Sequence, residues 1–278
     1  MNRRTLLGVA TALGLGAVPI RVRGGLAQEA SPVPDAGIVM IRWELQRIAS
    51  NNDAVTPDDP ANYWIQLFLD RSAGVRADCN QVFGTYTLDG SSLMLKPKAS
   101  TLAQCGEDSL SDRFLHDLGL VVSFVRTTNV SDELVLDMAA DSGQLTFTPA
   151  LTGVVWEWTE FQGGDGSVVT AADPNLYTVE FLDEGGARVV ADCNLGRADV
   201  AIDGSSIDMT VTTTKKACQE SSQDADFLRY LDEAVSYVIR DGQLALSLPA
   251  DAGIALFRPT IPLITPATPE SSNSGVNY

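Results

Sequence analysis

The chain has 278 residues, of which 45% are apolar and 20% are charged, and its formal net charge is −17. This length suits two domains of ordinary size, and the apolar share is enough to fill a core in each. So acidic a surface repels phosphate backbones and anionic lipid surfaces, which excludes nucleic acid as an expected partner. Solubility outside the cell is the simplest reason for the charge, and a cationic partner is the alternative.

The first 27 residues are typical of an export signal. Arg3 and Arg4 precede an apolar run from Leu6 to Ile20, which is shorter than the roughly 20 residues that span a bilayer. A small-x-small pattern ends at Ala27, as signal peptidase requires. The arginine pair favours a twin-arginine signal, and an ordinary secretory signal is the alternative. We therefore expect an extracytoplasmic protein, secreted or in the cell envelope, with no stable membrane insertion after cleavage.

The segments that flank the folded part have a different composition. Residues 28–37 follow the signal and are expected to form a mobile leader. Residues 261–278 are rich in Pro, Ser and Thr, which predicts a disordered tail, because such a composition cannot bury enough apolar surface to fold.

The second half of the chain repeats the first half with a shift of 110 to 114 positions. The order of the repeated motifs never changes, so the chain contains two copies of one module. We expect the first domain at 38–150 and the second at 152–260. The repeated pairs are Trp43-Glu44 with Trp156-Glu157, Asp59-Pro60 with Asp173-Pro174, Ala77-Asp78-Cys79-Asn80 with Ala191-Asp192-Cys193-Asn194, Asp89-Gly90 with Asp203-Gly204, and Phe114-Leu115 with Phe227-Leu228.

Period-two alternation dominates each copy. In residues 177–181, apolar side chains alternate with Thr and Glu, which predicts a half-buried strand. Asp89-Gly90 and Asp203-Gly204 predict hairpin turns, since glycine tolerates the positive φ that such turns need. The residues from 112 to 120 and from 224 to 234 each predict one short helix. The fold class is therefore mainly β: two tandem antiparallel barrel-like or sandwich-like domains, each with six to eight strands and one helix.

The four cysteines allow three disulfide pairings. The duplication selects Cys79–Cys105 and Cys193–Cys218, because each pair then stays within a module that folds by itself. Export favours oxidation, and closing such a loop should contribute about 3 kcal/mol. Free buried thiols and a redox role are the alternatives, although the C-x-x-C spacing of redox pairs is absent from the sequence.

The sequence offers no convincing catalytic or metal site. His116 is the single histidine and is expected on the polar side of the first helix. Acidic pairs such as Asp58-Asp59 and Asp183-Glu184 lie at turn-like positions, where carboxylates usually bond local backbone. No D-x-D-x-D-G spacing for calcium is present. We therefore expect no enzyme activity, no cofactor and no metal.

Six polar or aromatic side chains are candidates for a binding surface. The Asp and Asn beside the first cysteine of each copy form either a repeated ligand pair or, on the favoured interpretation, a loop in which Asn caps the backbone near the disulfide. Two tryptophans differ in phase from their apolar neighbours and are expected to be exposed, whereas Trp43 and Trp156 are expected in the cores. The candidates are Asp78, Asn80, Asp192, Asn194, Trp64 and Trp158.

The order of these motifs resembles the META/HslJ-type domain. In that family a Gly-Cys-Asn motif precedes a Gly-x-Tyr strand, and a Thr-x-x-Ala-Cys segment leads to a helix. The matching stretches are Asp78-Cys79-Asn80, Gly84-Thr85-Tyr86, Thr101-Leu102-Ala103-Gln104-Cys105, Cys193-Asn194 and Thr214-Lys215-Lys216-Ala217-Cys218. Asp replaces Gly before the first cysteine, and the second copy lacks the tyrosine. The resemblance implies a compact β barrel or sheet with a helix in each copy, and carries over no catalytic residues.

The resemblance also implies exported or envelope proteins tied to stress. Our leading hypothesis is a non-catalytic, monomeric binding or stress-related protein whose partner is an unidentified protein or small molecule. Two linked sites would gain effective concentration for the same ligand. The alternatives are a carrier that holds a small apolar ligand inside the barrel and a secreted hydrolase that uses acidic pairs.

Overall fold

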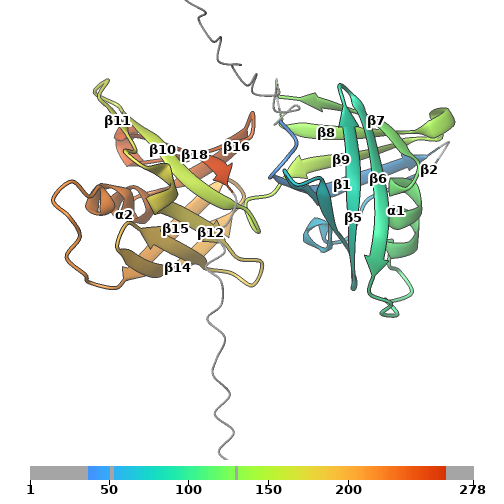
Figure 1. Cartoon of the computed structure of the whole chain (residues 1–278), viewed down its shortest axis with the longest axis horizontal. Helices are drawn as coiled ribbons and strands as arrows, with labels where there is room; N and C mark the ends of the chain where they lie inside the picture. Colours follow the sequence, from blue (N-terminus) through green and yellow to red (C-terminus); the bar gives the residue numbers. More distant parts are fainter. Residues whose placement is uncertain (1–36, 51–52, 129–130, 261–278) are drawn as a thin grey trace, which may run out of the picture. The chain divides into compact units, whose positions relative to one another are not determined.

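The computed structural model describes residues 37–50, 53–128 and 131–260, which form two β-rich modules (Figure 1). The predicted signal at 1–27, nearly all of the predicted leader and the predicted tail lie outside the described residues. In the part of the chain that is described, no helix is long and apolar enough to cross a membrane.

Each module contains nine strands and one α-helix. The first has β1 Arg42–Ser50, β2 Asp53–Val55, β3 Tyr63–Leu67, β4 Ser72–Ala77, β5 Asn80–Asp89, β6 Ser92–Ser100, α1 Ser111–Leu118, β7 Val121–Thr127, β8 Glu133–Met138 and β9 Gln144–Pro149. The second has β10 Val155–Gly163, β11 Val168–Thr170, β12 Tyr177–Phe181, β13 Ala187–Ala191, β14 Asn194–Asp203, β15 Ser206–Thr213, α2 Asp224–Asp232, β16 Ser236–Arg240, β17 Gln243–Ser247 and β18 Gly253–Thr260.

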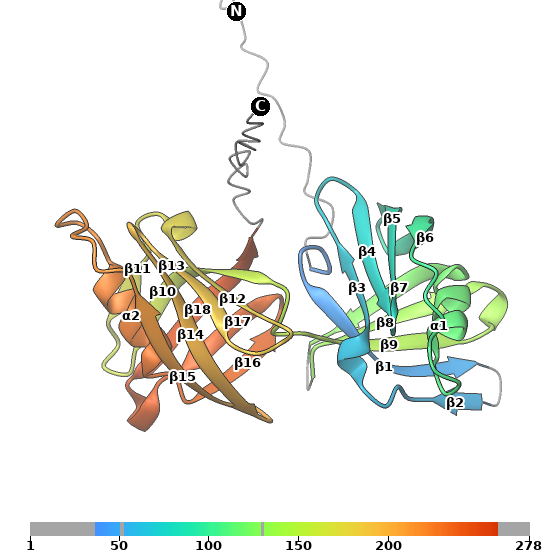
Figure 2. The same ribbon diagram turned by 90° about the horizontal axis from the view of Figure 1, so that it is seen from below.

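Both sheets close on themselves. The strand order in the first module is β2-β1-β3-β4-β5-β6-β7-β8-β9, and β1 also pairs with β9. The second sheet has the equivalent order, with β10 paired to β18, and all these strand pairs are antiparallel. Each module is thus a closed eight-stranded barrel with one extra strand on its rim (Figures 1 and 2). This confirms the mainly β fold class and selects the barrel over the sandwich. The count exceeds the predicted six to eight because β2 and β11 are three-residue strands without a long alternation.

The interior of each barrel is filled by large apolar side chains. Trp43, Phe114 and Phe147 are fully buried in the first core, and Trp156 and Phe257 in the second. The predicted core position of the two strand-opening tryptophans is confirmed. Their indole N–H groups donate over 3.0 Å to the carbonyls of Ile38 and Leu151, which satisfies the one polar atom of each buried ring.

A short segment before the first strand of each module bonds to the end of β3 or β12. A backbone N–H donates to a carbonyl there, from Met40 to Leu67 and from Gly153 to Phe181. Both donors have a positive φ, 69° and 67°. Leu151 belongs to the second apolar core. The second core therefore begins two residues after the end of β9, at Leu151.

The two helices begin and end close to the predicted positions. β6 and β7 pair only through Ser92 and Ser123, and the helix lies in the chain between these two strands. Phe114 and Leu118 of α1 join the first core. His116 is exposed on α1, as the sequence indicated.

The repeated Asp-Pro motif starts a short 3₁₀ turn in each module. The side chain of Asp59 accepts a hydrogen bond from the N–H of Ala61 over 3.1 Å, and Asp173 accepts one from Asn175 over 3.2 Å. Proline follows at the first turn position, where its missing N–H costs nothing. The motif is therefore a local capping device that leads into β3 and β12.

Candidate functional site

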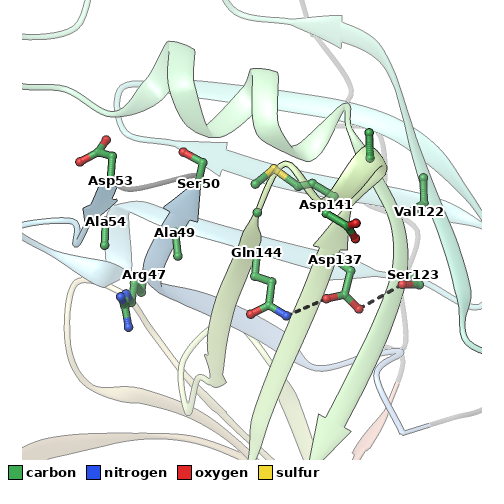
Figure 3. A pocket seen from close by; sticks show the side chains of 13 residues that line it. Arg47, Ala49, Ser50, Asp53, Ala54, Val122, Ser123, Asp137, Asp141 and Gln144 are labelled. Atoms are coloured by element: carbon green, nitrogen blue, oxygen red, sulfur yellow. Dashed lines mark hydrogen bonds between the residues drawn. The ribbon is translucent and has the colours of Figure 1, made fainter.

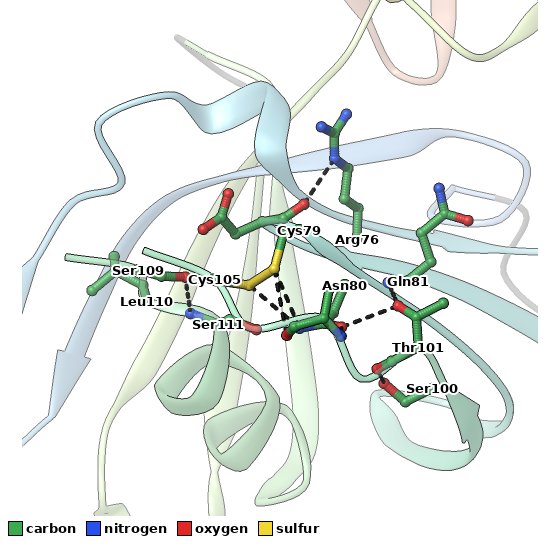
Figure 4. The surroundings of a disulfide bond; sticks show 12 residues. Arg76, Cys79, Asn80, Gln81, Ser100, Thr101, Cys105, Ser109, Leu110 and Ser111 are labelled. Carbon is green, nitrogen blue, oxygen red and sulfur yellow. Dashed lines mark hydrogen bonds between the residues drawn. A yellow bond between two sulfur atoms is a disulfide. The ribbon is translucent and has the colours of Figure 1, made fainter. Parts of the chain in front are cut away.

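Both disulfides form as predicted. Cys79 is bonded to Cys105 and Cys193 to Cys218, so each bond stays within its own module, and no cysteine remains free. Each bond ties the turn before β5 or β14 to the loop that leads to the helix, and Figure 4 shows the bond of the first module.

The Asn that follows the first cysteine organises that loop in the first module. The amide nitrogen of Asn80 donates to the carbonyl of Ala103 over 3.0 Å and contacts Sγ of Cys105 at 3.3 Å (Figure 4). Its amide oxygen accepts from the N–H of Ala103 over 2.8 Å and from the hydroxyl of Thr101 over 3.1 Å. Both the nitrogen and the oxygen of the side-chain amide are thus hydrogen-bonded within the protein.

Asn194 makes the same set of contacts in the second module. It donates to the carbonyl of Lys216 over 3.2 Å and accepts from the N–H of Lys216 and the hydroxyl of Thr214, both over 2.9 Å. Asn80 and Asn194 are both buried. As the favoured interpretation expected, these amides cap the loop beside the disulfide and replace the ladder bonds that an irregular loop lacks; a part in a binding surface stays a prediction for them.

Asp78 and Asp192 serve the backbone of the same turn. Their φ angles are 56° and 53°, the left-handed region that Gly, Asn and Asp tolerate best. Each N–H donates over 2.7 Å to a carbonyl of the preceding 3₁₀ turn, that of Asn62 or that of Leu176. This explains why Asp can stand where the resembling family has Gly. Both side chains are partly exposed, so a role in binding stays a prediction for them.

Trp158 corrects one prediction. It is fully buried, and its ring packs against Tyr177, Phe227 and Tyr230 with centroids 5.4–6.1 Å apart. Trp158 lies two residues after the buried Trp156, so simple alternation already turns its ring inward, whereas the β-bulge between Trp158 and Glu160 brings Phe161 inward as well. A prediction that compares Trp158 with residues beyond the bulge therefore assigns its ring to the outer face of the barrel, which is wrong.

Trp64 lies on the outer face of the first barrel and is only partly buried. Its ring covers Gly74 of the neighbouring strand, and the guanidinium of Arg42 lies 4.4 Å from the ring centroid. Trp64 remains a candidate contact residue, and it does not line the recess described next.

A polar recess lies on the outer surface of the first barrel and has a volume of about 820 Å³; Figure 3 shows the side chains that line it. Its centre is a row of directly opposed residues that crosses six adjacent strands, β2, β1, β9, β8, β7 and β6. Three members of the row that line the recess, Ala49, Ala54 and Ser123, have small side chains, which leaves the surface hollow there. The row is Ala54, Ala49, Gln144, Asp137, Ser123 and Ser92.

The carboxylate of Asp137 is held at the centre of this row. Its two oxygens accept from the hydroxyl of Ser123 over 3.1 Å and from the amide of Gln144 over 2.8 Å (Figure 3). Both donors are neutral, so they fix the orientation of the carboxylate without neutralising it. Asp141 lines the recess from the turn between β8 and β9, where its φ is 52°. Arg47 lines the recess from β1.

At one end of the recess a third acid is already neutralised. Asp53 on β2 forms an ion pair with Arg113 of α1 over 2.6 Å, and Arg113 also donates to the hydroxyl of Ser50 over 2.8 Å. Among the described residues, Asp137, Asp141 and Arg47 have no ion-pair partner within 4.0 Å. The recess therefore presents two uncompensated carboxylates and one guanidinium.

The second barrel contains the same row with different chemistry. Its members, in the equivalent strand order, are Val168, Gln162, Ile254, Ser247, Ser236 and Ser206. Ile254 replaces Gln144 and Ser247 replaces Asp137, so the central pair has no charge. The turn beside the row keeps its backbone shape, since Asp141 and Asp251 both have positive φ. The strand register and the turn are thus the same in both barrels, whereas the two central side chains of the row differ.

Sequence reasoning missed this row, because its members come from distant parts of the chain. The repeated turns Ala140-Asp141-Ser142-Gly143 and Ala250-Asp251-Ala252-Gly253 were the available signal. Aligning the two copies on them shows that Asp137 and Gln144 differ from their counterparts. Within the described residues, no group of three or more His, Cys, Asp or Glu side chains could hold a metal ion.

Comparisons with known proteins match both modules to one family. The family model described as META domain matches residues 37–152 and again residues 149–260. No curated protein matches the chain. A protein from Burkholderia xenovorans, solved by NMR, is 17% identical with a TM-score of 0.37, and the match covers 45% of this chain and 94% of that one. A crystal structure of a DUF4847 family protein from Bacteroides vulgatus is 13% identical with a TM-score of 0.32, covering 39% of this chain and 93% of that one.

The two matches of the family model together span most of the chain, and each covers one closed barrel with its helix and its disulfide. The chain therefore belongs to the META domain family and carries two META domains in tandem.

Proposed function

We propose that the chain is a non-catalytic, exported binding protein, and that its binding site is the recess on the outer surface of the first barrel. Two disulfides support an extracytoplasmic location, because such bonds persist in oxidising compartments. An envelope or stress-related role agrees with the resemblance noted in the sequence. The partner is a protein segment or small molecule that the recess can admit.

The observation that carries this proposal is the difference between the two rows. The duplication kept the strand register and the turn geometry, while Asp137 and Gln144 stand opposite Ser247 and Ile254. The recess has a volume of about 820 Å³, which lies within the usual range of ligand sites, about 300–1,000 Å³, and it contains a carboxylate of fixed orientation. We propose one site per chain rather than two copies of the same site.

The interior of the barrel is a weaker candidate for ligand binding. An apolar void lies in the first module between α1 and the strands, lined by Leu95, Leu115 and Leu118 among others, and has a volume of about 20 Å³. That is room for about one water molecule. A carrier of apolar ligands would need a cavity more than ten times larger, and large side chains fill the core instead.

Native mass spectrometry of protein recovered from its own culture medium tests the proposal. We expect the wild-type chain to carry an additional mass, and the variant D137S/Q144I, which gives the first row the central pair of the second, to lose it. The matched control is S247A in the second barrel, which should keep the mass. An additional mass that survives in D137S/Q144I, or no additional mass on the wild-type chain, would contradict the proposal.

A further inference from the structure

The chemistry of the recess indicates what kind of group it binds. Resting on the proposed function, we propose that the ligand is a polypeptide segment that inserts a basic side chain, with its apolar stem over the alanines of the row and its cationic head at Asp137. Each part of this proposal follows from a different feature of the recess.

The charge balance favours a cation. Asp137 and Asp141 face the recess without an ion-pair partner in the described part of the chain, whereas Asp53 already has Arg113. Hydrogen bonds between two ionised groups are shorter and stronger than neutral ones, so an ammonium or guanidinium group gains most at these oxygens. The net charge of −17 adds a long-range field that draws cationic partners toward the surface.

The floor of the recess favours an apolar stem. Ala49 on β1 and Ala54 on β2 are opposed across the strands, and Val122 on β7 lines the other side with 42% of its surface exposed. Long basic side chains cover such apolar surface with their methylene groups and keep the charge at the polar end. A free inorganic cation would leave this floor uncovered.

Two other polar groups of the recess, on Arg47 and Gln144, can form hydrogen bonds with a peptide backbone. Arg47 lies on β1 two residues before Ala49 and is exposed, so it can donate to a carbonyl of the ligand. The oxygen of the Gln144 amide is free to accept, because its nitrogen is the atom bonded to Asp137. The competing hypothesis is a ligand whose acidic side chain binds Arg47, and the glutamate peptide described next tests it.

The test uses three matched peptides and the full chain. The probes are acetyl-Ala-Lys-Ala-amide, its norleucine counterpart, which has the same stem without the charge, and its glutamate counterpart. Binding is followed by NMR from the side-chain amide signal of Gln144, at two salt concentrations. We expect the lysine peptide to bind at least about tenfold more tightly than either counterpart, and its binding to weaken at high salt because the recess is open to solvent.

Two variants, of which D137N is isosteric, locate the binding group. D137N keeps the shape and can keep bonds to Ser123 and Gln144, so it should fold normally and reduce lysine-peptide affinity about tenfold. R47Q removes the guanidinium that an acidic ligand would need, while its amide can still donate to a ligand carbonyl, so the preference for the lysine peptide over the glutamate peptide should increase. Equal affinity for all three peptides, preference for glutamate, no shift of the Gln144 signal, or full affinity in D137N would overturn the inference. If the additional mass seen on wild-type protein is nevertheless lost in D137S/Q144I, the recess remains the binding site and only the ligand class is wrong.

Discussion

The backbone N–H of Val211 on β15 donates to Oδ1 of Asp232 on α2 over 3.0 Å. The equivalent residues in the first module are Pro97 on β6 and Gly119 after α1. Proline has no N–H, so the first barrel lacks the donor that the second barrel caps. The two copies thus protect the same strand edge in different ways, one by capping an N–H and the other by removing it.

A double-mutant cycle on Val211 and Asp232 tests this relationship. We expect D232A to lower the free energy of unfolding by about 1 kcal/mol, because it leaves the N–H without its partner. In the V211P background the same change should cost almost nothing, which corresponds to a coupling of about 1 kcal/mol. Urea denaturation of the four proteins gives the values. The neighbouring variant E233A is the control, and additive effects would contradict the shared role.

Asn80 should matter far more for stability than its exposed neighbour Gln81. N80A removes the bonds to Ala103 and Thr101, and we expect a loss of about 2–4 kcal/mol, since several buried groups lose partners at once. Q81A should change stability by less than about 0.5 kcal/mol. Chemical denaturation of both variants measures the difference. Similar values for the two would show that the loop does not depend on the Asn amide.

Trp158 and Trp64 should respond differently to substitution and to quenchers. W158A empties a site among aromatic rings and should cost about 3–5 kcal/mol, whereas W64A on the outer face should cost about 1 kcal/mol. In variants that keep only one of these tryptophans, with the others changed to Phe, acrylamide should quench Trp64 and spare Trp158. Efficient quenching of Trp158 would contradict its burial among the rings of Tyr177, Phe227 and Tyr230.

The two disulfides should contribute similarly, because their loops span 26 and 25 residues. C79S/C105S and C193S/C218S should each lose about 3 kcal/mol, mainly through the greater freedom of the unfolded chain. Thermal unfolding of the two variants and of the wild type measures this. An unaffected melting temperature in either variant would show that its loop is held by the Asn contacts alone.

Much of the architecture was predictable, because the duplication carries it. The motif order gave two modules, and keeping each pair of cysteines inside one module gave both disulfides. Alternation with a strand-opening Trp gave the buried positions of Trp43 and Trp156. These inferences depend on local spacing, which the sequence displays directly.

The errors and omissions arise where structure depends on strand register. Trp158 alternates with the buried Trp156, but one extra residue after it in β10 brings Phe161 inward too, and no residue type marks that bulge. The row around Asp137 forms only when β1, β9, β8 and β7 are aligned, and its members Ala49 and Gln144 are far apart in the sequence. The sequence favoured Asn80 as a loop cap but could not name its partners, because Thr101 and Ala103 are distant from it along the chain.

Hydrogen exchange followed by mass spectrometry is the most direct test of a single outer binding site. Amide exchange of the full chain is compared in buffer and in concentrated medium from its own source. We predict slower exchange in the peptides that cover β8 and β9, and unchanged exchange in those that cover β17 and β18. Equal protection of both barrels, or protection of the second alone, would contradict the account.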